Sequence, residues 1–364
     1  MKRVLMLASV ASMIDQFNMP NIVLLQKLGY EVDVACNFIE GNTCSDERVA
    51  ELKQKLQDMH VRCYQIDFAR NIKHLGQNMR ALRQVEGLMK QNGYAFCHCH
   101  SPIGGTKVIY TAHGFHFYQG APVMNWLVYY PVEKVLSRWT DVLITINHED
   151  YARAKKKFHA GKTYYLPGIG IDLERFHAGD AETIQQKRQE LGLQPEDVFL
   201  LSVGELSDRK NHVVVIEAMK QLVQKHSQLR YFICGQGEKK QELQQLIRKY
   251  HLEDHVKLLG FRTDVAELCQ AADVFVFPSK QEGLPVALME AMACGVPVVC
   301  SRIRGNTDLV HNEKSLFEPD DEEQVKACIE WILKKNEKNV VYNKLSKYDL
   351  VNVIKEYGEI YAGK

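Results

Sequence analysis

The amino-acid sequence predicts an α/β protein with two doubly wound parallel sheets, one in each half of the chain. Short apolar segments alternate with amphipathic segments, which is typical of parallel strands joined by helices. The chain has 364 residues, enough for two domains of ordinary size. A turn-rich segment, 166–172, interrupts the alternation near the middle of the chain and indicates a domain boundary there.

The first half begins with a short buried strand and continues in the same alternation. A helix is expected from about Asn18, with Pro20 in its first turn and Gly29 at its end, which is the usual punctuation of a helix. A second helix is expected at about 125–138. The expected strands are Val4–Leu7, Glu31–Cys36, Phe96–His100, Lys107–Thr111 and Val142–Thr145.

One connection in this half is too short for the predicted fold. Only Ser101–Thr106 separates strand 96–100 from strand 107–111, whereas a parallel crossover needs a dozen or more residues. Either the two strands are not parallel neighbours, or a crossover segment is missing between Gly105 and Lys107. We favour the second explanation.

The second half repeats the pattern and ends in an amphipathic helix at 348–361. The predicted domains are therefore 1–170, 171–345 and a terminal helical segment, 346–364. The expected strands are Val198–Val203, Tyr231–Cys234, Val256–Leu259, Val274–Val276 and Val298–Cys300, and the expected helices are His212–Lys225, Lys239–Tyr250 and Pro285–Ala293.

Composition excludes several classes of protein. A hydrophobic content of 46% and a charged content of 25% are typical of a soluble globular chain. A net charge of +1 argues against a dedicated nucleic-acid binder. The ten cysteines show no disulfide-like spacing, which favours a reducing cytoplasm.

The most informative motif is the segment 278–297, which runs from a strand through a loop into a helix. Pro285 opens this helix, and the free N–H groups of a helix start bind anions. Glu282 lies in the loop and Glu290 in the second helical turn. Carboxylates accept hydrogen bonds from vicinal hydroxyls, so these two glutamates suit a sugar ring and a ribose. The structural alternative is a solvated loop glutamate beside a surface glutamate.

This motif, Pro-Ser-x3-Glu-Gly-x-Pro followed by Glu-Ala-Met-Ala-x-Gly-x-Pro-Val-Val with the spacing Glu-x7-Glu, resembles the family 4 retaining glycosyltransferases of the GT-B fold. The similarity is greatest to bacterial enzymes of capsule, exopolysaccharide or lipid-linked glycan synthesis. It implies two facing Rossmann-like domains, the first for the acceptor and the second for a nucleotide-sugar donor. A C-terminal helix would cross back to the first domain.

A second match follows the strand 198–203. Gly204 ends the strand, and Arg209 and Lys210 precede the next helix; two cations neutralise a diphosphate and help it leave. The family implies that they bind the diphosphate. Glu205 stands where relatives often carry an arginine, and Arg209 is the expected substitute. The alternative is a pair of solvated basic residues in a turn.

The resemblance extends the donor site to further residues. Asn306 and Thr307, after Gly305, correspond to a position near the diphosphate. Arg262 and its neighbours are expected to line the base pocket through backbone groups. The predicted donor-binding residues are Gly204, Gly235, Phe261, Arg262, Gly283, Leu284, Pro285, Val286 and Glu290.

In the first half, the family carries a histidine near the transferring sugar. We assign this role to His113, at the end of strand 107–111, with His116 as the second candidate. The expected catalytic residues are thus His113, Glu282, Arg209 and Lys210. Weaker acceptor-side candidates are Ser12, Asp15 and Gln16, in the loop expected after the first strand, and Glu149.

The run Cys97-His98-Cys99-His100 suggests a metal site, but alternate residues of a strand point to opposite faces. We therefore predict no metal and no cofactor; the UDP-sugar is a co-substrate. His100 begins a His-Ser-Pro-Ile-Gly-Gly turn that relatives also contain, where a crossover helix follows the glycines.

Basic residues of the first half predict a contact with the membrane. They gather in Arg70–Lys90 and in Lys155–Lys157, and relatives dock this domain on anionic headgroups. Trp126, Tyr129 and Tyr130 are candidates for the interface. Solvated helix faces and core packing are the alternatives. The expected location is the cytoplasm, at the inner face of the plasma membrane.

Taken together, the residues and the resemblance predict a retaining glycosyltransferase. It moves a hexose or N-acetylhexosamine from a UDP-sugar to a polyprenyl-diphosphate-linked or other glycan acceptor in surface polysaccharide synthesis. Two alternatives stay open: a nucleotide-sugar 2-epimerase, and a GT-B scaffold subunit without activity. Glu205 and the short connection 101–106 keep the second alternative open.

Overall fold

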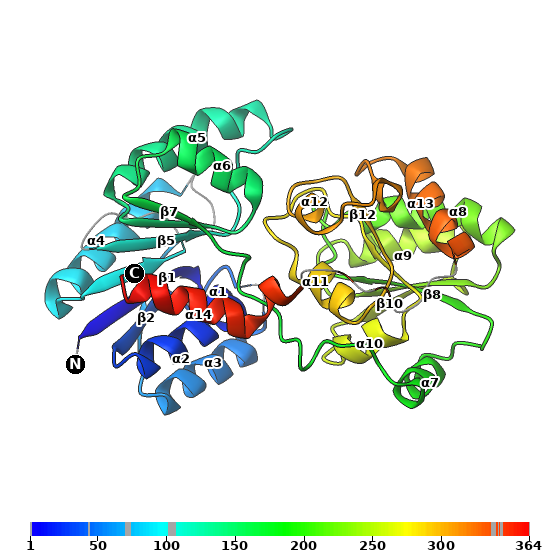
Figure 1. Ribbon diagram of the computed structural model, residues 1–364, viewed down its shortest axis with the longest axis horizontal. Helices are drawn as coiled ribbons and strands as arrows, with labels where there is room; N and C mark the ends of the chain where they lie inside the picture. The colour runs from blue at the N-terminus through cyan, green and yellow to red at the C-terminus, as the bar shows by residue number, and fades with distance from the viewer. Residues whose placement is uncertain are drawn as a thin grey trace. The chain divides into compact units, whose positions relative to one another are not determined.

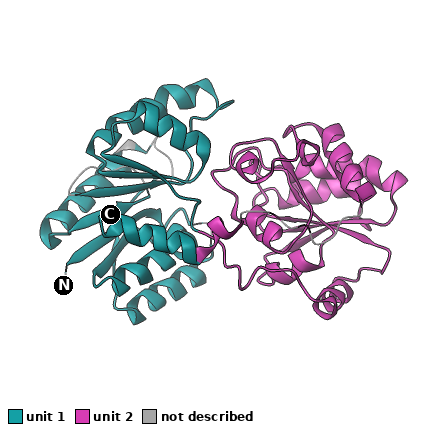
Figure 2. Ribbon diagram, viewed as in Figure 1, with its two compact units in different colours: residues 1–169, 351–364 teal, residues 170–350 magenta. Residues whose placement is uncertain are grey.

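The computed structural model divides the chain into two compact units (Figure 2). It describes residues 2–42, 44–69, 74–100, 107–335, 340, 342 and 345–363. The first unit consists of Met1–Ile169 with Val351–Lys364, and the second of Gly170–Leu350. Both are α/β units with a parallel sheet, which confirms the predicted fold class. No helix of the described ranges is long and apolar enough to cross a bilayer.

The first unit contains a seven-stranded sheet in the order β3-β2-β1-β4-β5-β6-β7 (Figure 1). Its strands are β1 (Arg3–Val10), β2 (Glu31–Asn37), β3 (Arg62–Gln65), β4 (Phe96–Cys99), β5 (Val108–Ala112), β6 (Val142–Thr145) and β7 (Lys162–Tyr165). Its helices are α1 (Ala11–Phe17), α2 (Met19–Lys27), α3 (Asp46–Asp58), α4 (Leu75–Asn92), α5 (Val123–Leu136), the 3-10 turn Ser137–Trp139, α6 (His148–Lys157) and α14 (Leu350–Tyr361).

Helices cover both faces of this sheet because successive strand residues point to opposite sides. Val4 and Met6 of β1 lie in one core, with α1 to α3 and α14. Leu5 and Leu7 lie in the other, with α4, α5 and α6. The C-terminal helix α14 buries Tyr357 and other apolar residues in the first of these cores, as the resemblance implied.

Strands β4 and β5 are parallel neighbours, with Cys97 opposite Val108. The explanation that they are not neighbours is therefore wrong. The connection itself, Ser101–Thr106, lies outside the described residues, and so do Arg70 and Lys73 of the predicted basic stretch.

A second correction concerns the segment after β1, which we expected to be a loop. Helix α1 instead begins at Ala11, directly after β1, and Ser12 lies buried in its first turn. Its backbone N–H donates to Asn42 Oδ1 at 3.1 Å. Ser12 is therefore held by the fold and presents no exposed hydroxyl.

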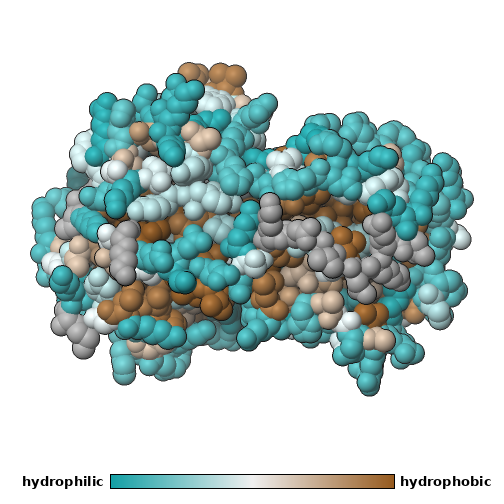
Figure 3. All heavy atoms as spheres, in the orientation of Figure 1, coloured by the Kyte–Doolittle hydropathy of each residue, from teal (hydrophilic) through white to brown (hydrophobic). Residues whose placement is uncertain are grey.

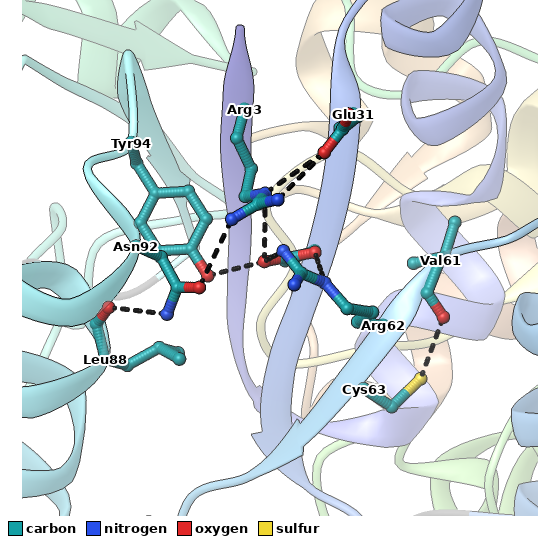
Figure 4. A network of polar contacts seen from close by, with 9 residues as sticks. Arg3, Glu31, Val61, Arg62, Cys63, Leu88, Asn92 and Tyr94 are labelled. Atoms are coloured by element: carbon teal, nitrogen blue, oxygen red, sulfur yellow. Dashed lines mark hydrogen bonds and ion pairs between the residues drawn. The ribbon is translucent and has the colours of Figure 1, made fainter. Parts of the chain in front are cut away.

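Near the amino ends of its strands, the same sheet carries a charge network around the buried Asp33; Figure 4 labels its partners Arg62 and Tyr94. Arg62 donates two hydrogen bonds to the Asp33 carboxylate, at 2.8 and 2.9 Å. Tyr94 donates a third at 2.6 Å. A buried carboxylate requires such partners. The network ties the beginnings of β2 and β3 to the turn before β4, so this edge of the sheet serves the fold.

The second unit contains a six-stranded sheet in the order β10-β9-β8-β11-β12-β13. Its strands are β8 (Val198–Val203), β9 (Leu229–Cys234), β10 (Val256–Gly260), β11 (Val274–Phe277), β12 (Val298–Ser301) and β13 (Leu316–Phe317). Its helices are α7 (Ala181–Glu190), α8 (His212–Lys225), α9 (Lys240–Lys249), α10 (Val265–Ala271), α11 (Val286–Ala293), α12 (Asn306–Leu309) and α13 (Glu322–Lys335), with 3-10 turns at Glu313–Ser315 and Leu345–Tyr348.

The order of these strands brings the two sequence motifs together. Strand β8, which leads to Arg209 and Lys210, is hydrogen-bonded to β11, which leads to Glu282. Because both strands are parallel, their carboxyl ends open on the same edge of the sheet, where ligands of open α/β sheets bind.

Candidate active site

The centre of the site is an ion-pair cluster in the second unit. Lys210 Nζ lies 2.7 Å from Glu282 Oε1, and Arg209 Nη1 lies 3.2 Å from the same oxygen. The side chains of Lys210 and Glu282 are 13% and 10% exposed, whereas that of Arg209 is 45% exposed. The two sequence motifs thus form one charged site.

A buried arginine, Arg304, stabilises the backbone of the loop that carries Glu282. Arg304 Nε donates to the backbone carbonyl of Glu282 at 3.1 Å, and Arg304 is 9% exposed. Sequence analysis missed this residue. Its signal was its position one residue before Gly305, in a segment already linked to the diphosphate.

Two opposing effects set the charge of Glu282. Burial raises the pKa of its carboxyl, but the charges of Lys210 and then Arg209 outweigh burial, and the net pKa lies below the ordinary value. Glu282 is therefore ionised at neutral pH. It neutralises two cations that would otherwise attract a polyanion.

Helix α11 points its N-terminus at the end of the same loop. Pro285 is the residue before the helix, Val286 is its first residue, and no side chain caps this end. The N–H groups of the first turn are thus available to an anion. Leu284 is buried beneath the loop, whereas Gly283 leaves its backbone uncovered by a side chain.

Glu290 lies in the second turn of α11 and differs electrostatically from Glu282. Burial raises the pKa of its carboxyl to about 7, and the charge of Arg175 only partly opposes this effect. Arg175 also donates to the backbone carbonyl of Thr263 at 2.9 Å. Sequence analysis missed Arg175, because it lies in the segment after the domain boundary and outside both motifs.

Two predicted glycines allow the strand ends to approach closely. A side chain on Gly235, whose φ is +151°, would strike the backbone carbonyl of Gly204. The Cβ of any residue at position 204 would in turn lie 3.2 Å from Lys210 Cδ. Gly235 thus lets the ends of β8 and β9 approach, and Gly204 leaves space beside Lys210.

The two residues predicted for the base pocket behave differently. Phe261 is 72% exposed, which leaves a ring free to stack on a planar ligand. The guanidinium of Arg262 is bound by Asp264 and Glu190, at 2.5 and 2.8 Å. Its side chain is therefore engaged within the protein, and only its backbone remains available.

Asn306 and Thr307 lie in the short helix α12, behind the Glu282 loop. The Asn306 amide donates to the Ser301 backbone carbonyl at 2.9 Å, and the Thr307 hydroxyl donates to the Ile303 carbonyl at 3.2 Å. Asn306 is fully buried. These contacts support the loop from within the fold.

In the first unit, His113 follows strand β5 and contacts two aromatic rings. Its Nε2 lies 2.8 Å from His100 Nδ1, and its ring centroid lies 5.4 Å from that of Phe17. The second candidate, His116, stacks instead on Tyr129 at 4.5 Å. Of the two, only His113 is linked to the buried histidines His98 and His100.

The acceptor-side candidates Asp15, Gln16 and Glu149 have different surroundings. Asp15 accepts two hydrogen bonds from Arg48, at 2.8 and 3.0 Å. Glu149 accepts from Arg153 and from the backbone N–H of Gln119. Both carboxylates are thus paired, whereas Gln16 is exposed at the end of α1.

The run 97–100 does not bring its four side chains to one point. Cys97 and Cys99 lie in the core beneath α4 and α5. On the opposite face, His98 Nδ1 lies 2.8 Å from the Tyr361 hydroxyl of α14. This alternation follows from the strand geometry used in the sequence analysis.

Comparison with known proteins places this geometry in a family. Residues 183–348 match the model described as "Glycosyl transferases group 1", and residues 23–175 match "Glycosyltransferase Family 4". The chain is 36% identical over 331 residues to EpsD of Bacillus subtilis (strain 168), which is named as a glycosyltransferase. The alignment covers 87% of this chain and 83% of EpsD.

A second relative has a more detailed name. The chain is 32% identical over 265 residues to the UDP-Gal:alpha-D-GlcNAc-diphosphoundecaprenol alpha-1,3-galactosyltransferase of Escherichia coli, with 67% of each protein covered.

Solved structures share the fold at lower identity. The structure of Anabaena Alr3699/HepE in complex with UDP and glucose has a TM-score of 0.77 at 19% identity, with all of both chains covered. The structure of WaaG, a glycosyltransferase of lipopolysaccharide biosynthesis, also has a TM-score of 0.77 at 19% identity, with 99% of this chain covered. The match of both family models and the extent of the EpsD alignment lead to one conclusion: the chain belongs to glycosyltransferase family 4, with the GT-B fold.

Proposed function

We propose that this chain transfers a hexose or N-acetylhexosamine from a UDP-sugar to a polyprenyl-diphosphate-linked or other glycan acceptor, with retention of anomeric configuration. The observation that carries the proposal is the cluster of Lys210, Arg209 and Glu282 beside the N-terminus of α11. Such a cluster combines cations for a diphosphate with a carboxylate for sugar hydroxyls.

In the proposed reaction, the diphosphate displaces Glu282 from the two cations and binds Lys210, Arg209 and the first N–H groups of α11. The bond between the anomeric carbon and the diphosphate oxygen breaks, and positive charge develops on the sugar while the cations stabilise the leaving group. The acceptor hydroxyl attacks from the same face. Its proton passes to a phosphate oxygen of UDP, and no cofactor or metal takes part.

Four further contacts complete the proposed donor site. The freed carboxylate of Glu282 accepts hydrogen bonds from the sugar hydroxyls, and the family resemblance assigns a second contact with the sugar to His113. Glu290 accepts from the ribose hydroxyls, and Phe261 stacks on the base. The complex of HepE with UDP-glucose and the lipid-linked acceptor in the name of the E. coli relative support this choice of substrates.

The test is a UDP-release assay of several UDP-sugars against membrane extract, with the product anomer assigned by NMR. We expect UDP release to depend on the extract. We also expect the product to have the anomeric configuration of the donor sugar. Consumption of the donor without acceptor would indicate the 2-epimerase. Tight binding of UDP, together with no production of UDP from any combination of UDP-sugar and extract, would indicate the inactive scaffold.

The same proposal places the enzyme in contact with the membrane through the first unit. Helix α5 supports this assignment, because it is apolar and only one of its faces packs on the protein. Trp126, Tyr129 and Tyr130 pack against the core of the first unit, whereas other apolar residues of the helix are exposed. Met124 and Leu127 are 63% and 65% exposed, and Val132, Val135 and Trp139 are also exposed on or just after this helix. Figure 3 shows hydrophobic atoms at the upper edge of this unit, where α5 lies in Figure 1.

Charge near α5 favours an anionic bilayer over another protein surface. Lys134 and Arg138 follow the apolar residues, and the exposed Lys155–Lys157 form the last turn of the neighbouring helix α6. The nearby carboxylates are engaged: Glu133 accepts from the Tyr110 hydroxyl, and Glu149 from Arg153. An apolar helix bordered by cations is typical of interfacial binding.

Substitution of Met124 or Leu127 by aspartate is expected to weaken vesicle binding by about tenfold each, because an apolar anchor is replaced by a charge that the lipid repels. Sedimentation with vesicles of phosphatidylglycerol and phosphatidylcholine measures this partition. The matched control is Leu28→Asp at the exposed end of α2, which should bind as the unaltered chain does. Equal binding of all variants would contradict the role of α5.

The raised pKa of Glu290 predicts a pH-dependent affinity for UDP. A ribose hydroxyl donates to the ionised carboxylate, whereas below pH 7 the group is protonated. For one group with a pKa of about 7, UDP binding should weaken about tenfold from pH 8 to pH 6. Titration calorimetry measures this change. The Glu290→Gln variant should retain only the smaller dependence of the phosphate itself, and an equally steep dependence in this variant would contradict the assignment.

The same group makes an opposite contribution to folding. Its folded pKa of about 7 exceeds the ordinary 4.5, so folding favours the neutral form. The stabilisation is complete below pH 4.5 and is lost as the pH rises through 7. Ligand binding and folding therefore prefer opposite protonation states of Glu290.

A further inference from the structure

Three histidines of the first unit stand in a row at the carboxyl ends of β4 and β5. His98 and His100 have ring centroids 4.7 Å apart, and His100 and His113 have centroids 5.0 Å apart in a stacked arrangement. One direct hydrogen bond joins His100 Nδ1 and His113 Nε2, which lie 2.8 Å apart. The proposed reaction uses only His113.

All three rings are held in the neutral form. Burial lowers the pKa of His98 to about 3 and that of His113 to about 4. Burial and the neighbouring rings lower the pKa of His100 well below its ordinary value. A neutral imidazole has one N–H donor and one bare nitrogen acceptor, so in the pair His100–His113 one ring donates and the other accepts.

The free nitrogen of His100 decides between the two arrangements. His100 Nε2 is buried and has no hydrogen-bond partner within the described part of the chain. If His113 donated, His100 would carry its proton on this nitrogen, as a buried donor without an acceptor. If His100 donates, the same nitrogen carries only a lone pair. Buried N–H donors without partners are rarer in folded proteins than buried acceptors without partners.

We propose that His100 is a positioning residue that donates its Nδ1–H to His113 Nε2 and so holds His113 in the tautomer protonated at Nδ1. His113 then presents a fixed N–H donor to a ligand and has no lone pair available as a base. The part of this inference that concerns the sugar rests on the proposed function: His113 donates to a hydroxyl oxygen of the transferring sugar.

Residues behind His100 keep this arrangement in place. His98 packs against His100, and both ring nitrogens of His98 are engaged: Nε2 with the Thr111 hydroxyl at 2.9 Å, and Nδ1 with the Tyr361 hydroxyl at 2.8 Å. Tyr361 belongs to α14, near the end of the chain. Helix α14 therefore contacts His98, the first of the three rings, and helps to hold their positions.

The test measures the tautomer directly, in protein with 15N-labelled histidine. Two-bond 15N–1H correlation spectra distinguish a protonated Nδ1 from a protonated Nε2, and the His113→Gln variant assigns the signals. We expect His113 to carry its proton on Nδ1. A proton on His113 Nε2 in the unaltered chain would overturn the proposal whether or not the chain transfers sugar.

Two substitutions of His100 separate positioning from packing. His100→Asn places an amide N–H where Nδ1 stood, so the tautomer of His113 and the kcat should be retained within about threefold. His100→Phe keeps a ring but removes the donor. The signals of His113 should then show a mixture of tautomers, and kcat/KM for the UDP-sugar should fall about tenfold.

The matched control is His116→Asn, which removes a nearby histidine that stacks on Tyr129 and not on His113. It should leave the tautomer of His113 unchanged. An unchanged tautomer in a folded His100→Phe variant would contradict the role of His100. Two results together would contradict only the proposed function: a changed tautomer of His113 in the His100→Phe variant, and no sugar transfer by the unaltered chain.

Discussion

Replacement of Glu282 by glutamine is expected to lower the rate of sugar transfer by about 100- to 1000-fold, while UDP still binds at least as tightly as before. The loss in rate follows because a carboxylate positioned for the sugar contributes several kcal/mol when water is excluded, as for other groups aimed at a transition state. UDP binding is spared because Glu282 occupies both cations before the diphosphate arrives.

The kcat, measured by UDP release, should therefore fall, whereas the Kd for UDP, measured by calorimetry, should not rise. Thermal unfolding of the variant tests whether the fold survives, which is expected because the amide keeps the size of the side chain. The matched control is Glu253→Gln on the exposed surface of the same unit, which should change neither quantity. A kcat for Glu282→Gln within a few-fold of the unaltered chain would remove Glu282 from the active site.

Replacement of Lys210 by alanine is expected to weaken UDP binding by about 10- to 100-fold. A hydrogen bond from a charged donor contributes about 1.5–3 kcal/mol, and every 1.4 kcal/mol is about a factor of ten. Lys210 should matter more than Arg209, because its side chain is 13% exposed whereas that of Arg209 is 45% exposed and better screened.

Calorimetry with UDP alone tests this difference, since it needs neither the correct sugar nor an acceptor. Lys249→Ala, on the exposed face of α9, is the control and should bind UDP unchanged. The single Lys210→Ala variant leaves the buried Glu282 carboxylate without its main partner. The double variant Lys210→Ala with Glu282→Gln also removes that carboxylate and its negative charge. Part of the affinity should return if Glu282 competes with the diphosphate. Tighter binding in the single Lys210 variant would contradict the cluster as a diphosphate site.

The sequence predicted the strands that are buried on both faces and missed β3 and β7, the two edge strands of the first sheet. Strands β1, β4 and β11 are almost wholly buried, so their apolar runs are visible without a structure. Strands β3 and β7 begin with exposed residues and are only partly buried. They lie at the two edges of the first sheet, where one side of the strand needs no apolar partner.

The expectation of a loop after β1 was also wrong. That expectation came from the resemblance, because relatives have a loop after the first strand. In the structure, Asn42 accepts from the backbone N–H of Ser12, and the burial of Ala11 and Ile14 stabilises the helix. A partner 30 residues along the chain is not visible in a local pattern.

What the sequence determined by itself is the set of residues and their local setting: Glu282 in a loop before a helix, Lys210 after a strand, and His113 at a strand end. Only the tertiary structure decided their partners. Lys210 and Glu282 are 72 residues apart, and His100 and His113 are 13 apart. Their contacts exist because strand order brings β8 beside β11 and β4 beside β5. Charge state, tautomer and the exposed face of α5 likewise depend on burial, which is a property of the packed fold.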